Sequence, residues 1–185
     1  MAQPWAGPKY GALFIPRVGQ EVIVTFLDGD PDRPVITSCV YHGQNKPPYD
    51  LPVEKTKTTI MSISTKDGRG NFNEISFEDA KGREDLVTHA ARDRNEVVEN
   101  DKNTEVKNNQ LITVENDRAV RTEGNENLNV GGGRAVSVKA DERHVNSADF
   151  NQKVSDNFTL KVNGNITIDA SGTVKISGAK VILNG

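Results

Sequence analysis

The 185-residue sequence has little of what supports many common kinds of site. Cys39 is its only cysteine, so no disulfide can form within the chain, and we expect this small side chain in a core. The three histidines, His42, His89 and His144, show none of the short spacings typical of zinc sites. Apolar runs are short, and no charged-then-apolar leader opens the chain, so neither a membrane span nor a signal peptide is predicted.

Hydrophobic residues are also scarce, at 35% of the chain. The formal net charge is −3, so the sequence has no electrostatic footprint for binding nucleic acid. With this composition, a chain either buries its apolar residues in a very regular pattern or is partly disordered.

Proline and most aromatic residues are confined to the first half of the sequence. All eight prolines, Trp5 and all three tyrosines lie before residue 95, and residues 96–185 contain no proline. A proline-free run of this length suits a structure in which nearly every backbone NH is hydrogen-bonded. We therefore expect two differently built parts, with a boundary near residue 95.

The first part has short β-type runs separated by turn residues. Strands are predicted at residues 21–27, 34–41, 58–65, 73–79 and 85–91, with turns at 29–34, 67–71 and 79–83. Residues 45–52 (NKPPYDLP) are expected to be extended without forming a central strand, because proline cannot donate to a ladder. This spacing indicates a small β-barrel followed by a β extension.

In the second part, similar residues recur at every eighth position. The valine register holds valine at seven of the nine positions from 98 to 162, with Thr122 and Asn146 as exceptions. The second register lies two residues earlier, on the same face of a strand, and comprises Ile112, Val120, Leu128, Val136, His144, Gln152, Leu160, Ile168 and Ile176. The corner register follows each valine by two residues, with Asn100, Asn108, Asn116, Gly124, Gly132, Gly164 and Gly172. Asn and Gly tolerate positive φ, so each eight-residue unit, here called an octad, is predicted to be a short strand plus a tight corner.

A third register becomes apolar only late in the chain, with Phe150, Phe158, Ile166, Val174 and Ile182. Earlier it holds Lys102, Gln110, Arg118, Glu126, Arg134 and Glu142. The apolar face of the octads therefore widens toward the C-terminus, while the positions between the registers stay polar.

An octad buries too few side chains to be stable alone, so its apolar face must close on others around an axis. A single chain could form a three-faced solenoid, or three chains could intertwine as a triangular prism, with successive octads of one chain on successive faces. We favour the trimer, whose shaft would be roughly 50 Å long. Its predicted core comprises Val98, Val106, Ile112, Val114, Val120, Leu128, Val130, Val136, Val138, Val154, Phe158, Leu160, Val162, Ile166, Ile168, Val174 and Ile176.

Four N-terminal stretches carry a family resemblance: residues 3–7 (QPWAG), 16–36, 40–52 and 73–84. They resemble the valine–glycine repeat (VgrG) family, the spike proteins of type VI secretion, related to Rhs-associated Vgr proteins and to the central spike of contractile phage tails. The resemblance implies an all-β homotrimer, with a partial OB-fold-like barrel at 1–55, a β neck at 56–95 and an intertwined triple-stranded β-helix needle at 96–185. Ser38 and His42 stand where Gly and Asn are common in the family.

The resemblance also implies a function and partners. The trimer would be a membrane-puncturing needle, assembled in the bacterial cytoplasm and injected into a target cell or the medium. The family's hub and first OB strands, which would contact the tail tube and baseplate, are expected to be missing before Met1. A PAAR-type tip protein or an effector would dock at the C-terminal tip, formed by Val181, Ile182, Leu183, Asn184 and Gly185.

Three polar residues interrupt the inward registers. In a trimer, His144, Asn146 and Gln152 would each occur three times around the axis and could line a section that holds water or an ion. The alternative is a local register slip that turns them outward, with Val145 as the substitute inward residue.

Catalytic groupings are not evident in the sequence. Acids and serines are scattered through turns and exposed strand positions, without a nucleophile–base pair, so no enzyme activity, cofactor or metal centre is predicted. The alternative function is a phage-type tail spike or fibre shaft that binds surface polysaccharide. Exposed aromatics along the shaft would mark it, but Phe150 and Phe158 are the only aromatics after residue 95 and both belong to the third register.

Overall fold

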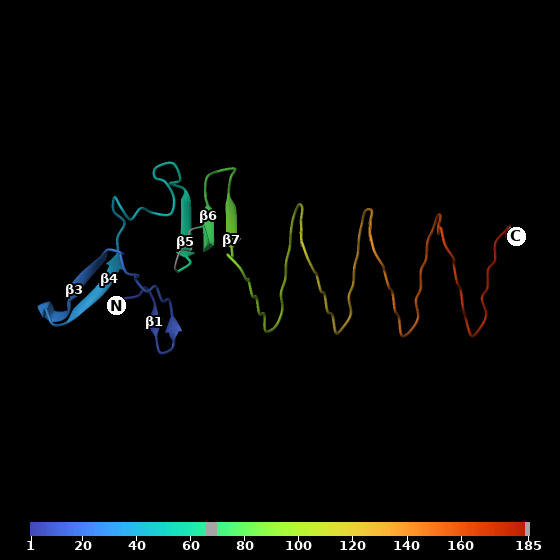
Figure 1. Ribbon diagram of the computed structural model, residues 1–185, viewed down its shortest axis with the longest axis horizontal. Helices are drawn as coiled ribbons and strands as arrows, with labels where there is room; N and C mark the ends of the chain where they lie inside the picture. The colour runs from blue at the N-terminus through green and yellow to red at the C-terminus, as the bar shows by residue number, and fades with distance from the viewer. Residues whose placement is uncertain (66–69, 184–185) are drawn as a thin grey trace. The chain divides into compact units, whose positions relative to one another are not determined.

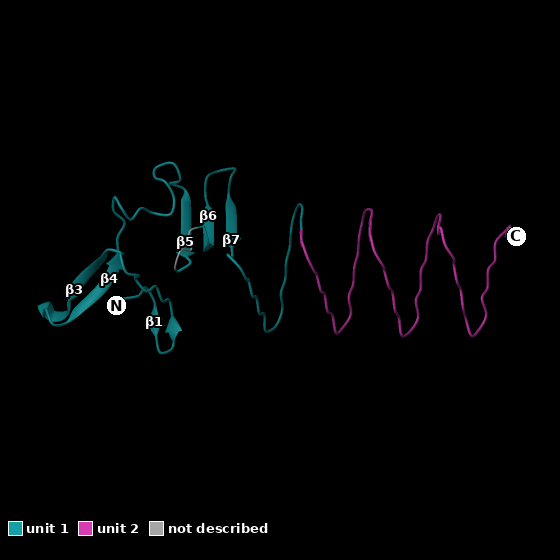
Figure 2. Cartoon of the chain, in the orientation of Figure 1, with its two compact units in different colours: residues 1–111 teal, residues 112–185 magenta. Residues whose placement is uncertain are grey.

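The computed structural model describes residues 1–65 and 70–183. The chain divides into two units, Met1–Leu111 and Ile112–Gly185 (Figure 2). All seven strands found in the described residues belong to the first unit (Figure 1). One short 3-10 turn, η1 (Leu27–Gly29), is the only helical element in the same residues, which confirms the all-β prediction.

The first two strands form a tight hairpin around the QPWAG motif. Strand β1 (Ala6–Gly7) pairs antiparallel with β2 (Tyr10–Gly11), and the Trp5 ring packs edge-on against the Tyr10 ring with centroids 5.8 Å apart. A Cβ atom at Gly7 would lie 2.3 Å from the Tyr10 ring, so the ring packs directly against the glycine backbone and would have to move for a larger residue. The motif therefore builds a small aromatic hairpin.

The next pair of strands confirms the predictions at 21–27 and 34–41. Strand β3 (Val22–Phe26) runs antiparallel to β4 (Pro34–Cys39), and η1 lies in the connection. Asp28 and Gly29 adopt φ values of 54° and 75° there, a conformation that Asp and Gly tolerate best. Arg33 Nη1 donates a hydrogen bond to Asp28 Oδ2 at 2.7 Å across the turn. Residues 45–52 form no strand, as expected.

The predicted barrel is present only as open pieces. Within residues 1–65, β1–β2 and β3–β4 are separate two-stranded sheets. Cys39 was expected in a core, but this prediction is wrong, because the residue is exposed. The physical reason is that β4 pairs with β3 alone, so no closed barrel encloses the end of the strand.

A three-stranded antiparallel meander follows, in the order β5–β6–β7. It comprises β5 (Lys57–Ile63), β6 (Phe72–Glu78) and β7 (Asp85–His89), which confirms the strands predicted at 58–65, 73–79 and 85–91. Most of the predicted turn at 67–71 lies outside the described residues. His89, at the end of β7, stacks on the Phe72 ring with centroids 4.3 Å apart, which is a plain structural role.

From residue 90 to residue 183 the described chain is extended and forms no strand pairs. Bends recur every eight residues, for example at 99–100, 107–108, 115–116 and 123–124, and in unit 2 the backbone is a zigzag (Figure 2). The second residue of each bend belongs to the corner register, so the octad as an extended segment plus a corner is confirmed.

The expectation that the corner residues adopt positive φ is not confirmed. The described positive-φ residues all lie before residue 90, so corner glycines such as Gly124 and Gly164 have ordinary φ values. A Cβ atom at either glycine would meet nothing within 4 Å in this chain. Their selection therefore reflects neither a left-handed backbone nor crowding within the single chain.

Octads of the described chain do not hydrogen-bond to one another. A single-chain solenoid would pair each octad with the one three octads further along, and no such ladder is found among residues 90–183. The single chain leaves its octads open, with their backbone and side chains uncovered.

Candidate assembly surface and polar layer

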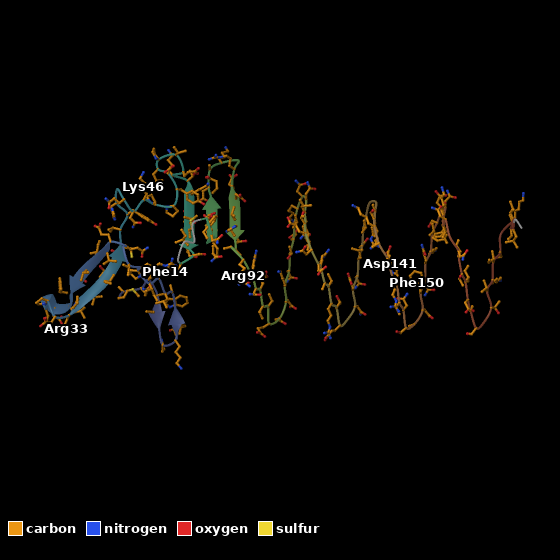
Figure 3. The ribbon with its side chains drawn as sticks, viewed as in Figure 1. Phe14, Arg33, Lys46, Arg92, Asp141 and Phe150 are labelled. Atoms are coloured by element: carbon orange, nitrogen blue, oxygen red, sulfur yellow. The ribbon has the colours of Figure 1, made fainter. Side chains whose placement is uncertain are left out.

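The valine register is half-exposed throughout. Its seven valines each expose between 44% and 48% of their surface, and the apolar members of the second register, from Ile112 to Ile176, expose 58–69%. None of the hydrophobic residues in the described part of the chain is buried. Figure 3 shows Phe150 and the other side chains of unit 2 projecting from a single extended thread. These apolar registers need a cover that the chain does not supply.

The accessible surface supports the same conclusion for the chain as a whole. One chain exposes 19041 Å², whereas a folded monomer of its mass would expose about 8,800 Å². The excess is too large for an ordinary globular monomer. Burial against other chains is the route by which such a sequence can gain hydrophobic stabilisation.

Side-chain contacts sort the octad positions onto two faces. His144 Nε2 lies 2.8 Å from Glu142 Oε1, which joins the second and third registers on one face. Gln152, Val154 and Phe158 line a common recess on that face. The ion pair between Arg121 and Glu123, at 2.7 Å, joins two positions of the opposite, polar face. The valine, second and third registers therefore share one side of the extended chain, here called the assembly face.

A second apolar surface, which was not predicted from the sequence, lies on the meander. Ile60, Ile75, Phe77 and Leu86 lie on one face of β5–β7 and expose between 46% and 63% of their surface. The opposite face carries Glu74 and Ser76, which are the only buried residues in the described chain. This sheet buries polar groups and exposes apolar ones. The alternation of Ile75 and Phe77 with polar residues was the signal that could have identified it.

The buried polar face is organised around the Glu74 carboxylate. Tyr49 Oη and Thr59 Oγ1 both donate hydrogen bonds to Glu74 Oε1, the latter at 2.8 Å. Lys57 Nζ lies 4.4 Å from the centroid of the Tyr49 ring. The proline-rich segment is thereby held to the sheet through Tyr49.

These contacts shift two pKa values. Burial alone would raise the pKa of Glu74, but hydrogen bonds led by Tyr49 and Thr59 outweigh it and hold the pKa below its ordinary value of 4.5. The hydrogen bond to Glu74, together with burial, raises the pKa of Tyr49 above its ordinary value of 10.0. Both shifts favour the arrangement in which a neutral phenol donates to an ionised carboxylate.

The three residues of the predicted polar layer lie in two neighbouring octads. Bends at 139–140, 147–148 and 155–156 enclose them at the regular spacing of eight, so the backbone shows no slip there. His144 contacts Glu142, and Gln152 lines the recess with Val154 and Phe158. Asn146 occupies the valine register between them. Whether this layer holds water or an ion stays a prediction.

The predicted tip is extended and exposed where the structure describes it. Val181, Ile182 and Leu183 expose 52%, 63% and 89% of their surface. Asn184 and Gly185, the other predicted tip residues, lie outside the described residues.

Metal sites and membrane spans are the other kinds of feature considered for the described residues. Residues 1–65 and 70–183 of a single chain contain no group of three or more His, Cys, Asp or Glu side chains placed to hold a metal ion. Over the same residues, we find no helix whose length and apolar character would let it cross a membrane.

The sequence matches two known families. Residues 58–176 match the bacteriophage T4 gp5 C-terminal trimerisation domain, and residues 1–41 match the type VI secretion system/phage-baseplate injector OB domain. The first match covers β6, β7, all of β5 except Lys57, and most of the octads, which are the parts with uncovered apolar faces.

The individual relatives are much longer than this chain. Over 54% of its length, the chain is 52% identical to the type VI secretion system spike protein VgrG1a of Pseudomonas aeruginosa and 51% identical to VgrG3 of Vibrio cholerae. It is 52% identical over the same share to a V. cholerae protein named actin cross-linking toxin VgrG1. The chain spans 16%, 10% and 9% of these three proteins, respectively.

Proposed function

Because the chain belongs to the family of the bacteriophage T4 gp5 C-terminal trimerisation domain, we propose that it is part of a homotrimeric spike of a type VI secretion system. The observation that carries the proposal is the uncovered assembly face, repeated every eight residues inside the region that matches a trimerisation domain. The relatives named as spike proteins support the same function.

In the proposed trimer, three chains intertwine and each octad lies on one face of a triangular prism. Strands on each face come from all three chains in turn, so the unpaired backbone of residues 90–183 gains its ladder between chains. The apolar registers form the core, and the apolar face of β5–β7 is covered at the neck. Residues 1–55 would belong to the partial barrel, residues 56–95 would form the neck, and residues 96–185 would form the needle.

Such a needle would act by stiffness. A shaft with its backbone groups paired between chains and its apolar registers inside resists bending when it is driven through a membrane. Its partners would be tail-tube and baseplate components at one end, and a PAAR-type tip protein or effector at residues 181–185. Assembly would take place in the bacterial cytoplasm, followed by injection into a target cell or release into the medium.

The decisive experiment is the mass of the purified chain in solution. Light scattering should give about 60 kDa, three times the 20.2 kDa of one chain. A monodisperse 20.2 kDa species would overturn the proposal, because the apolar registers would then be stable without partners.

For the polar layer, we propose that three copies each of His144, Asn146 and Gln152 surround the axis and hold ordered water or one ion. The unbroken bend spacing on either side supports this placement. A crystal structure of the trimer, with elemental analysis of the same sample, tests it. Density coordinated by these side chains is expected, and side chains that point into bulk solvent would contradict the proposal.

The alternative of a polysaccharide-binding fibre receives less support. Phe158 shares a recess with Val154 on the assembly face, and Phe150 belongs to the same register as Phe158. Both aromatic side chains would be buried in the trimer core, so they could not stack on sugars.

A further inference from the structure

The valine register leaves the axial alignment of the chains ambiguous. Val106 and Val114 are identical neighbours in the valine register, as are Val130 and Val138. If one chain of a trimer slipped along the axis by one octad, these valines would meet equivalent valines. Contacts between these valines would hardly change, so the valines alone do not define the axial alignment of the chains.

The third register contains a feature that distinguishes neighbouring octads. From Arg118 it continues through Glu126 and Arg134 to Glu142, so the charge reverses at every step of eight residues. The charge pattern therefore repeats every sixteen residues, twice the octad period. We call these four residues the charge ladder.

The charge ladder lies on the assembly face. Glu142, its last member, contacts His144 of the second register at 2.8 Å. Two octads further along the chain, Phe158 occupies the same register and shares a recess with Gln152 and Val154. Ladder side chains therefore leave the backbone on the side that needs partners.

These charges are also available for contacts between chains. In the described part of unit 2, no ion pair joins Arg118, Glu126 or Arg134 to another side chain of the same chain. Oppositely charged ladder residues are separated by a full octad and its corner, and the chain zigzags between them (Figure 2). A second chain can bring complementary charges closer than one chain can.

The prism geometry determines which residues become neighbours. Successive octads of one chain occupy successive faces, so the strand beside a given octad is the next octad of another chain. Residue i of one chain then lies beside residue i+8 of its neighbour, at a strand spacing of about 4.8 Å. Arg118 meets Glu126, Glu126 meets Arg134, and Arg134 meets Glu142.

We propose that the charge ladder sets the axial register between the chains of the homotrimer, an inference that rests on the trimer proposed above. In the aligned trimer each ladder layer holds three like charges around the axis, and the adjacent ladder layers, eight residues before or after it, carry the opposite charge, so every ladder step pairs opposite charges three times. After a slip of one octad, Arg118 would meet Arg134 or another Arg118, and Glu126 would meet Glu142 or another Glu126. Like charges directly opposite on neighbouring strands are destabilising, so each slipped state is disfavoured.

Cysteine pairs on the polar face can report the register and leave the ladder intact. With Cys39→Ser as background, Thr159→Cys/Thr167→Cys places thiols eight residues apart, and Asn151→Cys/Thr167→Cys places them sixteen apart. Neighbouring strands are within disulfide reach, at a Cα separation of about 5 Å. The eight-residue pair should give a covalent trimer on a non-reducing gel, and the sixteen-residue pair should not.

The role of the ladder is tested by charge reversal in the same backgrounds. Arg134→Glu places a third carboxylate between Glu126 and Glu142, so we expect a lower unfolding temperature and less covalent trimer from the eight-residue pair. Arg118→Glu/Glu126→Arg/Arg134→Glu/Glu142→Arg inverts every sign but keeps the alternation, and should restore both readouts. Lys139→Glu is the matched control, because its neighbours eight residues away are Gly131 and Ser147.

Three results would overturn the inference: a wild-type-like trimer from Arg134→Glu, no recovery in the inverted ladder, or covalent trimer from the sixteen-residue pair in the native ladder. Failure of the underlying trimer proposal is separately visible. In that case the unsubstituted chain has the mass of a monomer, before any ladder variant is made.

Discussion

Glu74 occupies the middle of β6, with its carboxylate buried beneath Tyr49 and Thr59. A buried carboxylate is costly unless hydrogen bonds compensate it, and here they do so well enough to lower its pKa. Nothing in the spacing of NEISFED indicated this, because Tyr49 comes from a segment 25 residues earlier. The partner of Glu74 was decided by the path of the chain.

Glu74→Gln should therefore change how stability depends on pH. The pKa of Glu74 is lowered in the folded state, so its contribution is fully present above the ordinary value of 4.5 and is lost as pH falls through the lowered pKa. The wild type should lose more thermal stability than Glu74→Gln between neutral pH and about pH 3. Unfolding followed by circular dichroism measures this, with Glu115→Gln as an exposed control. Equal acid sensitivity in wild type and Glu74→Gln would contradict the prediction.

Thr122 is the exception in the valine register that is closest to valine in shape. In the trimer its hydroxyl would be buried three times around the axis, so Thr122→Val should stabilise each chain by about 1 kcal/mol. An increase in the midpoint of thermal unfolding would show it. Thr113→Val, on the polar face, should leave the midpoint unchanged. A decrease for Thr122→Val would mean that the hydroxyl has a polar partner inside the needle.

At the scale of elements, local pattern predicted much of the structure. Strands β3 to β7 lie within two residues of their predicted bounds, because alternation of apolar residues and punctuation by turns are local signals. The octads were also predicted correctly, because the corner residues recur every eight positions in the sequence and the backbone bends recur at the same spacing. The backbone conformation of the corners was not predicted correctly, because Gly permits positive φ without requiring it.

The meander β5–β7 gives a prediction at this scale. Its apolar face is uncovered in one chain, so Phe77→Asp would place a charge where the neck of the trimer is expected to pack. We expect a smaller trimer fraction in light scattering and a lower unfolding temperature. Lys81→Asp, in the turn between β6 and β7, should have little effect. Unchanged trimers from Phe77→Asp would show that this face is not an interface.

Taken as a whole, the single chain leaves its apolar residues uncovered. It exposes 19041 Å² and buries no hydrophobic residue in its described part, so it lacks a core of its own. In the proposed trimer, folding and association would be one process, so stability should rise with protein concentration. This state follows from the octads, each too small to bury its own apolar side chains.

Val138→Asp tests the needle core directly. The substitution would place three carboxylates around one axis in an apolar layer, so assembly should be blocked. Light scattering should then show monomers or aggregates at concentrations where the wild type is trimeric. Ser137→Asp, one residue earlier and on the opposite face, is the matched control and should form trimers. Wild-type-like trimers from Val138→Asp would contradict the proposed core.

The octad, the short strands and the family resemblance could be read from local sequence, because periodicity, turn residues and motifs are properties of neighbouring positions. Which groups are covered depends on the three-dimensional path of the chain. It placed Glu74 and Ser76 inside the meander, left Cys39 exposed and exposed Ile75 and Phe77. Burial depends on segments distant along the chain, which carry no mark in the local pattern. Burial of the assembly face likewise cannot be inferred from local sequence, because the residues proposed to cover it belong to other chains.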